Sequence, residues 1–66
     1  MPKQPRWSVK RKLDQAIGNI ETACLYLSQV AERARGQHPE IAESLEGMID
    51  ALMSLAELVN SFRDAL

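Results

Sequence analysis

Two runs of apolar residues, spaced alternately by four and three positions, occupy almost the whole chain. Such spacing keeps side chains on one side of a helix, at the a and d positions of a heptad. The break between the runs, Gly36 to Pro39, is long enough only for a tight turn. The chain is therefore predicted to form two long helices folded back on each other. The first run comprises Leu13, Ile17, Ile20, Cys24, Leu27, Ala31 and Ala34, and the second comprises Ile41, Leu45, Met48, Leu52, Leu55, Val59, Phe62 and Leu66.

Local signals place the ends of the two helices. Ser8 suits the N-cap position, because its hydroxyl can accept a hydrogen bond from a free amide of the first turn. Gly36 suits the left-handed residue that ends many helices, and Pro39 suits a first helical turn. The fold class predicted is all-α, an antiparallel two-helix hairpin. Its parts are an extended basic arm at 1–7 and a helical hairpin at 8–66, with helices at about 8–35 and 39–65.

Antiparallel packing is expected to pair the two apolar runs layer by layer. Small residues would then meet large ones near the turn, as interdigitating layers prefer. The expected pairs are Ala31 with Leu45, Leu27 with Met48, Cys24 with Leu52, Ile20 with Leu55, Ile17 with Val59 and Leu13 with Phe62.

A hairpin of 66 residues has one shared seam and no second layer, so it is too small to bury a core of its own. Small domains make up for this with disulfides, a metal or oligomerisation. Cys24 is the single cysteine and His38 the single histidine, which leaves neither a disulfide nor a metal-ligand set. Oligomerisation is the remaining route, so the expected partner is a second copy of the chain.

The g positions beside the two seams indicate which face the second copy covers. They are apolar or small in both helices, and in an antiparallel pair both g flanks lie on the same side. We therefore expect a homodimer that forms a four-helix bundle. Its predicted interface comprises Val9, Ala16, Ala23, Tyr26, Val30, Ser44, Gly47, Ala51, Ser54 and Leu58. The alternative interface lies on the opposite side, at Ala42, Ile49, Met53 and Ala56.

Charge is polarised along the chain although the net charge is only −1. The first twelve residues carry cations and no acid, and three of these cations oppose the dipole of the first helix. Either Asp64 and the C-terminal carboxylate neutralise them, or an external polyanion does. Trp7 either stacks on a nucleic-acid base or closes the open end of the bundle over Leu13, Phe62 and Leu66. The candidate nucleic-acid contacts are Lys3, Arg6, Trp7, Lys10, Arg11 and Lys12.

Enzymatic activity is not expected from this sequence. The acids Glu43, Asp50, Glu57 and Asp64 recur at the outermost f position, where carboxylates stay solvated. Cys24 is expected to pack in the seam, and His38 to lie on the surface of the turn. Cofactor motifs, metal-binding spacings and a membrane-spanning run are all missing, so no cofactor, metal, small-molecule substrate or membrane partner is expected. A single seam cysteine suits a cytoplasmic protein.

In length, two-helix layout and heptad regularity, the whole chain resembles the Rop family of small plasmid RNA-binding regulators. That resemblance implies hairpins that dimerise into a four-helix bundle. The outward residues of the first helix, such as Gln15 at f and Tyr26 at c, do not align with Rop's RNA-binding residues, and the Gly36–Pro39 turn also differs. The leading expectation is a non-enzymatic dimeric interaction module that presents a rigid bundle and basic arms to a macromolecular partner. A nucleic-acid-binding regulator is the alternative.

Overall fold

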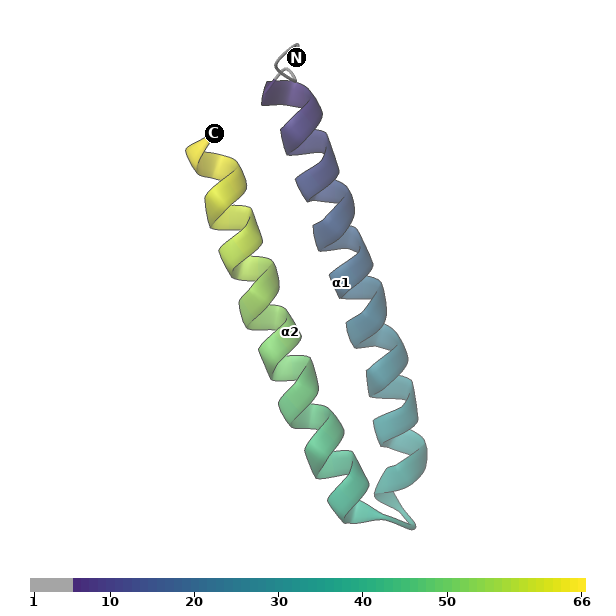
Figure 1. Cartoon of the computed structure of the whole chain (residues 1–66). Coiled ribbons are helices and arrows are strands. Elements are labelled where there is room, and N and C mark those ends of the chain that lie inside the picture. The colour runs from purple at the N-terminus through teal and green to yellow at the C-terminus, as the bar shows by residue number, and fades with distance from the viewer. Residues whose placement is uncertain (1–5) are drawn as a thin grey trace.

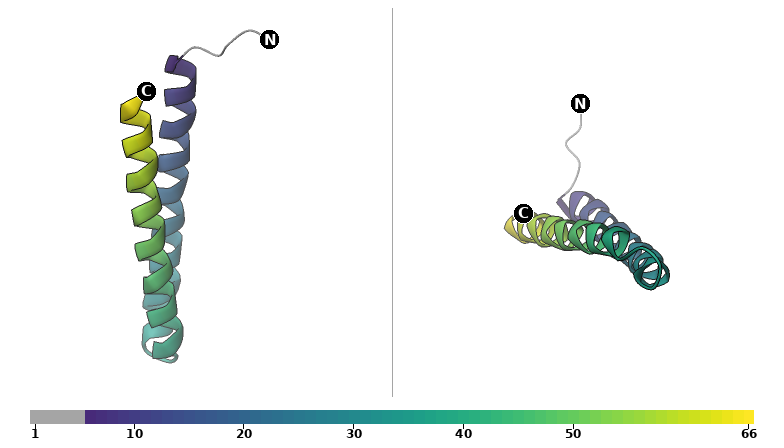
Figure 2. Two further views of the ribbon diagram at one scale, coloured as in Figure 1. Left: turned by 60° about the vertical axis from the view of Figure 1, so that its left-hand side comes forward. Right: turned by 90° about the horizontal axis from the view of Figure 1, so that it is seen from below.

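The computed structural model describes residues 6–66 as two helices that pack side by side (Figure 1). Helix α1 spans Arg6–Arg35 and helix α2 spans Pro39–Ala65. They form a rod with extents of 54 × 17 × 15 Å. The start of α1 and the end of α2 lie at one end of this rod, and the turn lies at the other (Figure 2). The predicted all-α antiparallel hairpin is confirmed.

The predicted helix ends are correct at Arg35, Pro39 and Ala65, and the start of α1 is not. Helix α1 begins at Arg6, so Ser8 lies inside the first turn and is not the N-cap. A proline restricts only itself and the residue before it, and nothing in Arg6 or Trp7 opposes a helix. The predicted arm at 1–7 thus loses its last two residues to α1, and residues 1–5 lie outside the described residues.

The turn between the helices needs no left-handed residue. Gly36 has a negative φ, which corrects the expected left-handed conformation. The carbonyl of Ala34 instead accepts hydrogen bonds from the amides of Gln37 at 3.1 Å and His38 at 2.6 Å. Pro39 then opens α2 in its first turn, as predicted.

Helix α1 packs on α2 with its predicted seam. All seven members of the first apolar run are buried or half-buried, and Ala31 is only 2% exposed. The g residues Val9, Ala16 and Ala23 are half-buried beside this seam.

Helix α2 packs with a different stripe from the one predicted. Four members of the second run, Ile41, Met48, Leu55 and Phe62, are exposed. Ala42, Ile49 and Ala56 lie against α1 in their place, together with Leu45, Leu52 and Val59. The Sγ of Cys24 accordingly lies 4.0 Å from the carbonyl oxygen of Ile49.

This rotation of α2 overturns the expected layers that paired α1 with Met48, Leu55 and Phe62. It also shows that three residues of the alternative interface, Ala42, Ile49 and Ala56, belong to the intramolecular seam. Small residues allow two helix backbones to approach closely, and Ala42 is 3% exposed. The alanines therefore favour the observed packing over the stripe of larger residues.

Cross-helix ion pairs mark one edge of the hairpin, which we call the ion-pair edge (Asp14, Arg35, Glu46 and Arg63). Arg63 Nε lies 2.7 Å from Asp14 Oδ1, although its N–H does not point at the oxygen, so the contact is electrostatic. Arg35 bridges Glu46 of α2 and Glu32 of its own helix. The hydrogen bond to Glu46, followed by the charge of Glu32, raises the pKa of Arg35 above its usual value.

Candidate interaction surfaces

Large apolar side chains cover the edge of the hairpin opposite the ion-pair edge. In an antiparallel pair the g flank of α1 shares a side with the d and g flanks of α2, whereas the ion pairs join e and b positions. Leu58 is 68% exposed and Phe62 is 58% exposed. We call this surface the apolar face, and its exposed members are Tyr26, Val30, Ile41, Met48, Leu55, Leu58 and Phe62.

The apolar face is wider than the sequence indicated. Its d residues Ile41, Met48, Leu55 and Phe62 were expected to pack inside the hairpin, and the rotation of α2 adds them to the g residues. Seven side chains, each with about half of its surface exposed, give a face of roughly 800 Å², which is the share that each partner contributes to a standard protein interface.

The predicted interface residues fall into two groups in the hairpin. Those of α1 near the seam, Val9, Ala16 and Ala23, are half-buried by α2. The others, Tyr26, Val30, Ser44, Gly47, Ala51, Ser54 and Leu58, are exposed. A Cβ built on Gly47 would meet no atom within 4 Å, so α1 does not cover this residue. Gly47 belongs to a small-residue stripe of exposed positions on α2 (Ser44, Gly47, Ala51 and Ser54).

The hairpin has little interior. Ala31 and Ala42 are the only buried residues among 6–66, and no large side chain in that range is fully buried. Burial of apolar surface is the main favourable term in folding, at about 25 cal/mol per Å². A hairpin whose largest apolar side chains are half exposed therefore lacks the burial that stabilises ordinary small domains.

The basic cluster at the start of α1 (Arg6, Lys10, Arg11 and Lys12) has few internal partners. Arg6 Nη1 donates a hydrogen bond to the main-chain oxygen of Leu66 at 3.2 Å. The nearby acids are engaged elsewhere: Asp14 lies against Arg63, and Asp64 Oδ1 is 3.4 Å from Arg63 Nη1. Within residues 6–66, no carboxylate lies within ion-pair distance of the other three cations.

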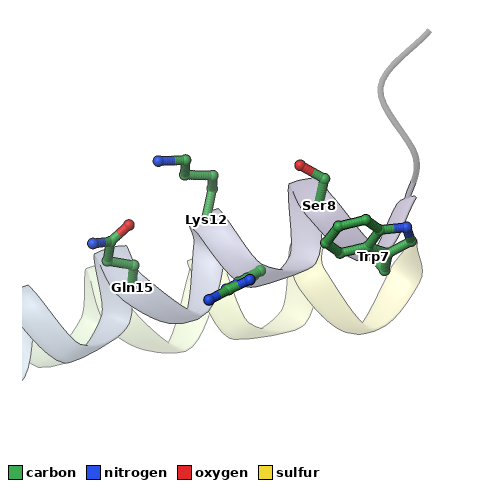
Figure 3. A pocket seen from close by; sticks show the side chains of 5 residues that line it. Trp7, Ser8, Lys12 and Gln15 are labelled. Carbon is green, nitrogen blue, oxygen red and sulfur yellow. The ribbon is translucent and has the colours of Figure 1, made fainter.

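An open hollow of about 600 Å³ lies on the outer side of α1 beside this cluster, lined by Trp7, Ser8, Arg11, Lys12 and Gln15. Figure 3 shows these side chains along the first turns of α1, with Ser8 and Lys12 projecting next to each other. Trp7 is 65% exposed, so it does not close the end of the hairpin over Leu13 and Phe62. The sixth candidate contact, Lys3, lies outside the described residues.

Two lining residues of the hollow, Ser8 and Gln15, were not among the predicted contacts. A helical signal was available, because Trp7, Arg11 and Gln15 follow one another at intervals of four and therefore share one face. Ser8 and Lys12 form a second such row beside it. Applying this spacing to the basic segment would have found both residues.

The remaining chemically reactive side chains do not form a cluster. Within the described part of the chain, no group of three or more His, Cys, Asp or Glu residues could hold a metal ion. Cys24 is half-buried in the seam, and His38 lies in the turn with Nδ1 3.7 Å from Glu40 Oε1. Glu43, Asp50, Glu57 and Asp64 are exposed, as expected for f positions.

Comparisons with models of known protein families, with curated proteins and with solved structures returned no match to this chain. Neither helix of the described region holds an apolar stretch sufficient to cross a bilayer. The interaction surfaces are therefore argued from their own chemistry.

Proposed function

We propose that this protein is a homodimeric, non-enzymatic interaction module in which two hairpins form a four-helix bundle through their apolar faces. The observation that supports the proposal is the contrast between the hairpin's interior and its apolar face. Its most buried residues are two alanines, whereas seven of the ten large apolar side chains that are exposed among residues 6–66 lie on one edge. A second copy of the chain would cover the apolar face and so give each hairpin a buried core.

The area and shape of the apolar face fit this occupant. The face offers roughly 800 Å² per chain, and two such shares make an interface of standard size. Gly47, Ala51 and Ser54 keep the middle of α2 narrow, which allows a second backbone to approach closely. Helices in such bundles pack around a core of apolar seam positions.

The module acts by presenting rigid helices rather than by catalysing a reaction. Dimerisation leaves the ion-pair edge and the basic cluster on the outside, because both lie on other sides of the hairpin. Each dimer then carries two copies of the basic cluster on a stiff scaffold. Two linked copies of a weak site bind an extended partner more tightly than one.

Sedimentation equilibrium at micromolar concentration tests the dimer, with an expected mass of twice 7.4 kDa. Leu58→Glu is expected to shift the protein to monomer and to reduce its helical circular dichroism, since folding and association are coupled. Met53→Glu is the matched control, because Met53 is also an exposed apolar residue of α2 but lies toward the ion-pair edge. A well-folded wild-type monomer would refute the proposal, and a Leu58→Glu dimer would place the interface elsewhere.

A further inference from the structure

We infer that the first turns of α1 bind single-stranded nucleic acid, with a base stacked on Trp7 and phosphates bound by Arg11 and Lys12. The inference deepens the proposed function by naming the class of partner, and it rests on that function only for the pairing of two sites on one scaffold. Four observations support it: the unpaired cations, the exposed indole, the shape and polarity of the hollow, and its position relative to the apolar face.

Arg6 is held by the main-chain oxygen of Leu66, whereas Lys10, Arg11 and Lys12 have no carboxylate within ion-pair distance among residues 6–66. Their own helix dipole disfavours positive charge in the first turns, and Asp14 and Asp64 lie against Arg63 instead. Arg11 and Lys12 are exposed and have no ion-pair partner within residues 6–66. A phosphate backbone supplies the negative charge that these side chains lack, and it releases bound counterions when it does so.

The indole of Trp7 is available for stacking. It is 65% exposed and lines the same hollow as Arg11 and Lys12. An aromatic plane beside a cationic track is how proteins bind single strands, because every base has a face that can stack. A duplex offers its phosphates but not its base faces, so Trp7 distinguishes a single strand from a duplex.

The hollow itself fits a nucleotide better than a lipid surface. It is a surface site, half open to solvent and lined by five side chains of one face of α1, so an extended strand can lie along it. Besides Trp7, its lining is polar: the hydroxyl of Ser8 and the amide of Gln15 can hydrogen-bond to a sugar or a base edge. Membrane-surface helices need a broad apolar face, which this side of α1 does not have.

The hollow remains open in the proposed dimer. Trp7, Arg11 and Gln15 occupy e, b and f positions of α1, away from the g positions of the apolar face. Lys12 shares the c position with Tyr26 but lies two heptads nearer the start of the helix. A second copy seated on Val30 and Leu58 therefore leaves the hollow accessible. Since each chain carries a complete hollow, binding of a short strand does not require the dimer.

The test titrates the full chain with single-stranded RNA and DNA oligonucleotides of twelve bases at low salt. Trp7 is the only tryptophan, so its emission reports stacking directly, and a fluorescein label on the strand reports binding by polarisation. We expect quenching together with binding. Two phosphate contacts per chain predict an affinity loss of about sevenfold between 50 and 200 mM salt.

Two pairs of variants identify the site. Arg11→Glu is expected to weaken binding at least tenfold, and Arg33→Glu is its matched control, because it makes the same charge change at an exposed residue near the turn. Trp7→Ala is expected to weaken binding by about five- to 150-fold, the equivalent of one stacked base. Leu25→Ala shortens an apolar side chain of α1 that is 57% exposed and lies outside both the hollow and the apolar face, and it should leave the affinity unchanged.

Several results would overturn the inference. They are the absence of any binding to RNA or DNA strands at low salt, an equal loss of affinity in Arg11→Glu and Arg33→Glu, and duplex binding as tight as single-strand binding. A blue shift of Trp7 emission on anionic vesicles with no response to nucleic acid would assign the cluster to a membrane surface. Sedimentation of the same samples distinguishes failure of nucleic-acid binding from failure of the dimer. A monomer whose Trp7 emission is quenched by an oligonucleotide would refute only the proposed function.

Discussion

The two edges of the hairpin differ in how they are completed. At the ion-pair edge, Asp14 lies against Arg63 and Arg35 bridges to Glu46, so the charged groups find partners within one chain. On the apolar face, Val30 of α1 is exposed, and so are Leu55, Leu58 and Phe62 of α2. Contacts within one chain thus pair the charged groups of the ion-pair edge and leave the apolar face exposed. On the proposed function, a second copy of the chain covers this face.

Shortening one large side chain on each edge is expected to have the largest effect on stability. Leu55 and Met53 are near neighbours on α2, with exposed fractions of 46% and 55%, and they point to opposite edges. If a second copy buries Leu55, Leu55→Ala lowers the free energy of unfolding by about 2–4 kcal/mol, whereas Met53→Ala changes it by under about 0.5 kcal/mol. Urea denaturation at one protein concentration measures both values. Equal small effects would mean that the apolar face stays in water.

A second prediction concerns the seam between the two edges. Ala42 is 3% exposed against α1, so a larger side chain there must push the helices apart. Ala42→Leu is expected to lower the free energy of unfolding by about 1–3 kcal/mol through overpacking. Ala65→Leu is the control at an exposed position, and its effect should stay within about 0.5 kcal/mol. Thermal unfolding followed by circular dichroism compares them, and a harmless Ala42→Leu would contradict the packing of α2 on this stripe.

A third prediction uses two glycines that are equivalent within one chain. A Cβ at Gly18 or at Gly47 would meet no atom within 4 Å. Replacing a helical glycine with alanine stabilises a helix by about 1 kcal/mol, so Gly18→Ala should raise the free energy of unfolding by that amount. Gly47 belongs to the predicted small-residue stripe, and there the contact with a second copy should cancel the gain. Equal gains at both positions in urea denaturation would remove Gly47 from the interface.

These edges also show where the sequence was informative. In helix α1 the apolar a and d positions are flanked by apolar g residues but by polar e residues, so the stripe could extend to one side only and periodicity predicted its seam residue by residue. Helix α2 carries apolar or small residues at a, d, e and g, so two stripes competed and the spacing could not decide between them. Which stripe packs on α1 depends on how closely the two helix backbones approach. Ala42 and Ala56 permit a close approach, and the heptad pattern carries no information about this distance.

The basic cluster follows the same logic. The sequence showed a run of cations beside Trp7 and so predicted these contacts. The structure places Trp7, Arg11 and Lys12 around one hollow. Whether Asp64 would neutralise them was not readable, because that depends on which way Arg63 turns. Arg63 lies in the seam next to Asp14, a consequence of the rotation of α2.

The smallest effect is expected at the ion-pair edge itself. Asp14 and Arg63 are partly exposed, at 55% and 34% of their side chains, so water and salt screen their attraction and the pair should contribute under about 1 kcal/mol. Asp14→Asn should lower the free energy of unfolding by that small amount at low salt, and the difference should vanish near 1 M salt, where the Debye length is about 3 Å. Glu21→Gln is the control, since Glu21 is exposed one heptad further along α1 and has no ion pair among the described residues. If Asp14→Asn instead lowered the free energy of unfolding as much as Leu55→Ala in the same urea series, the ion-pair edge would stabilise the hairpin as strongly as the apolar face. That result would contradict the larger contribution assigned here to the apolar face.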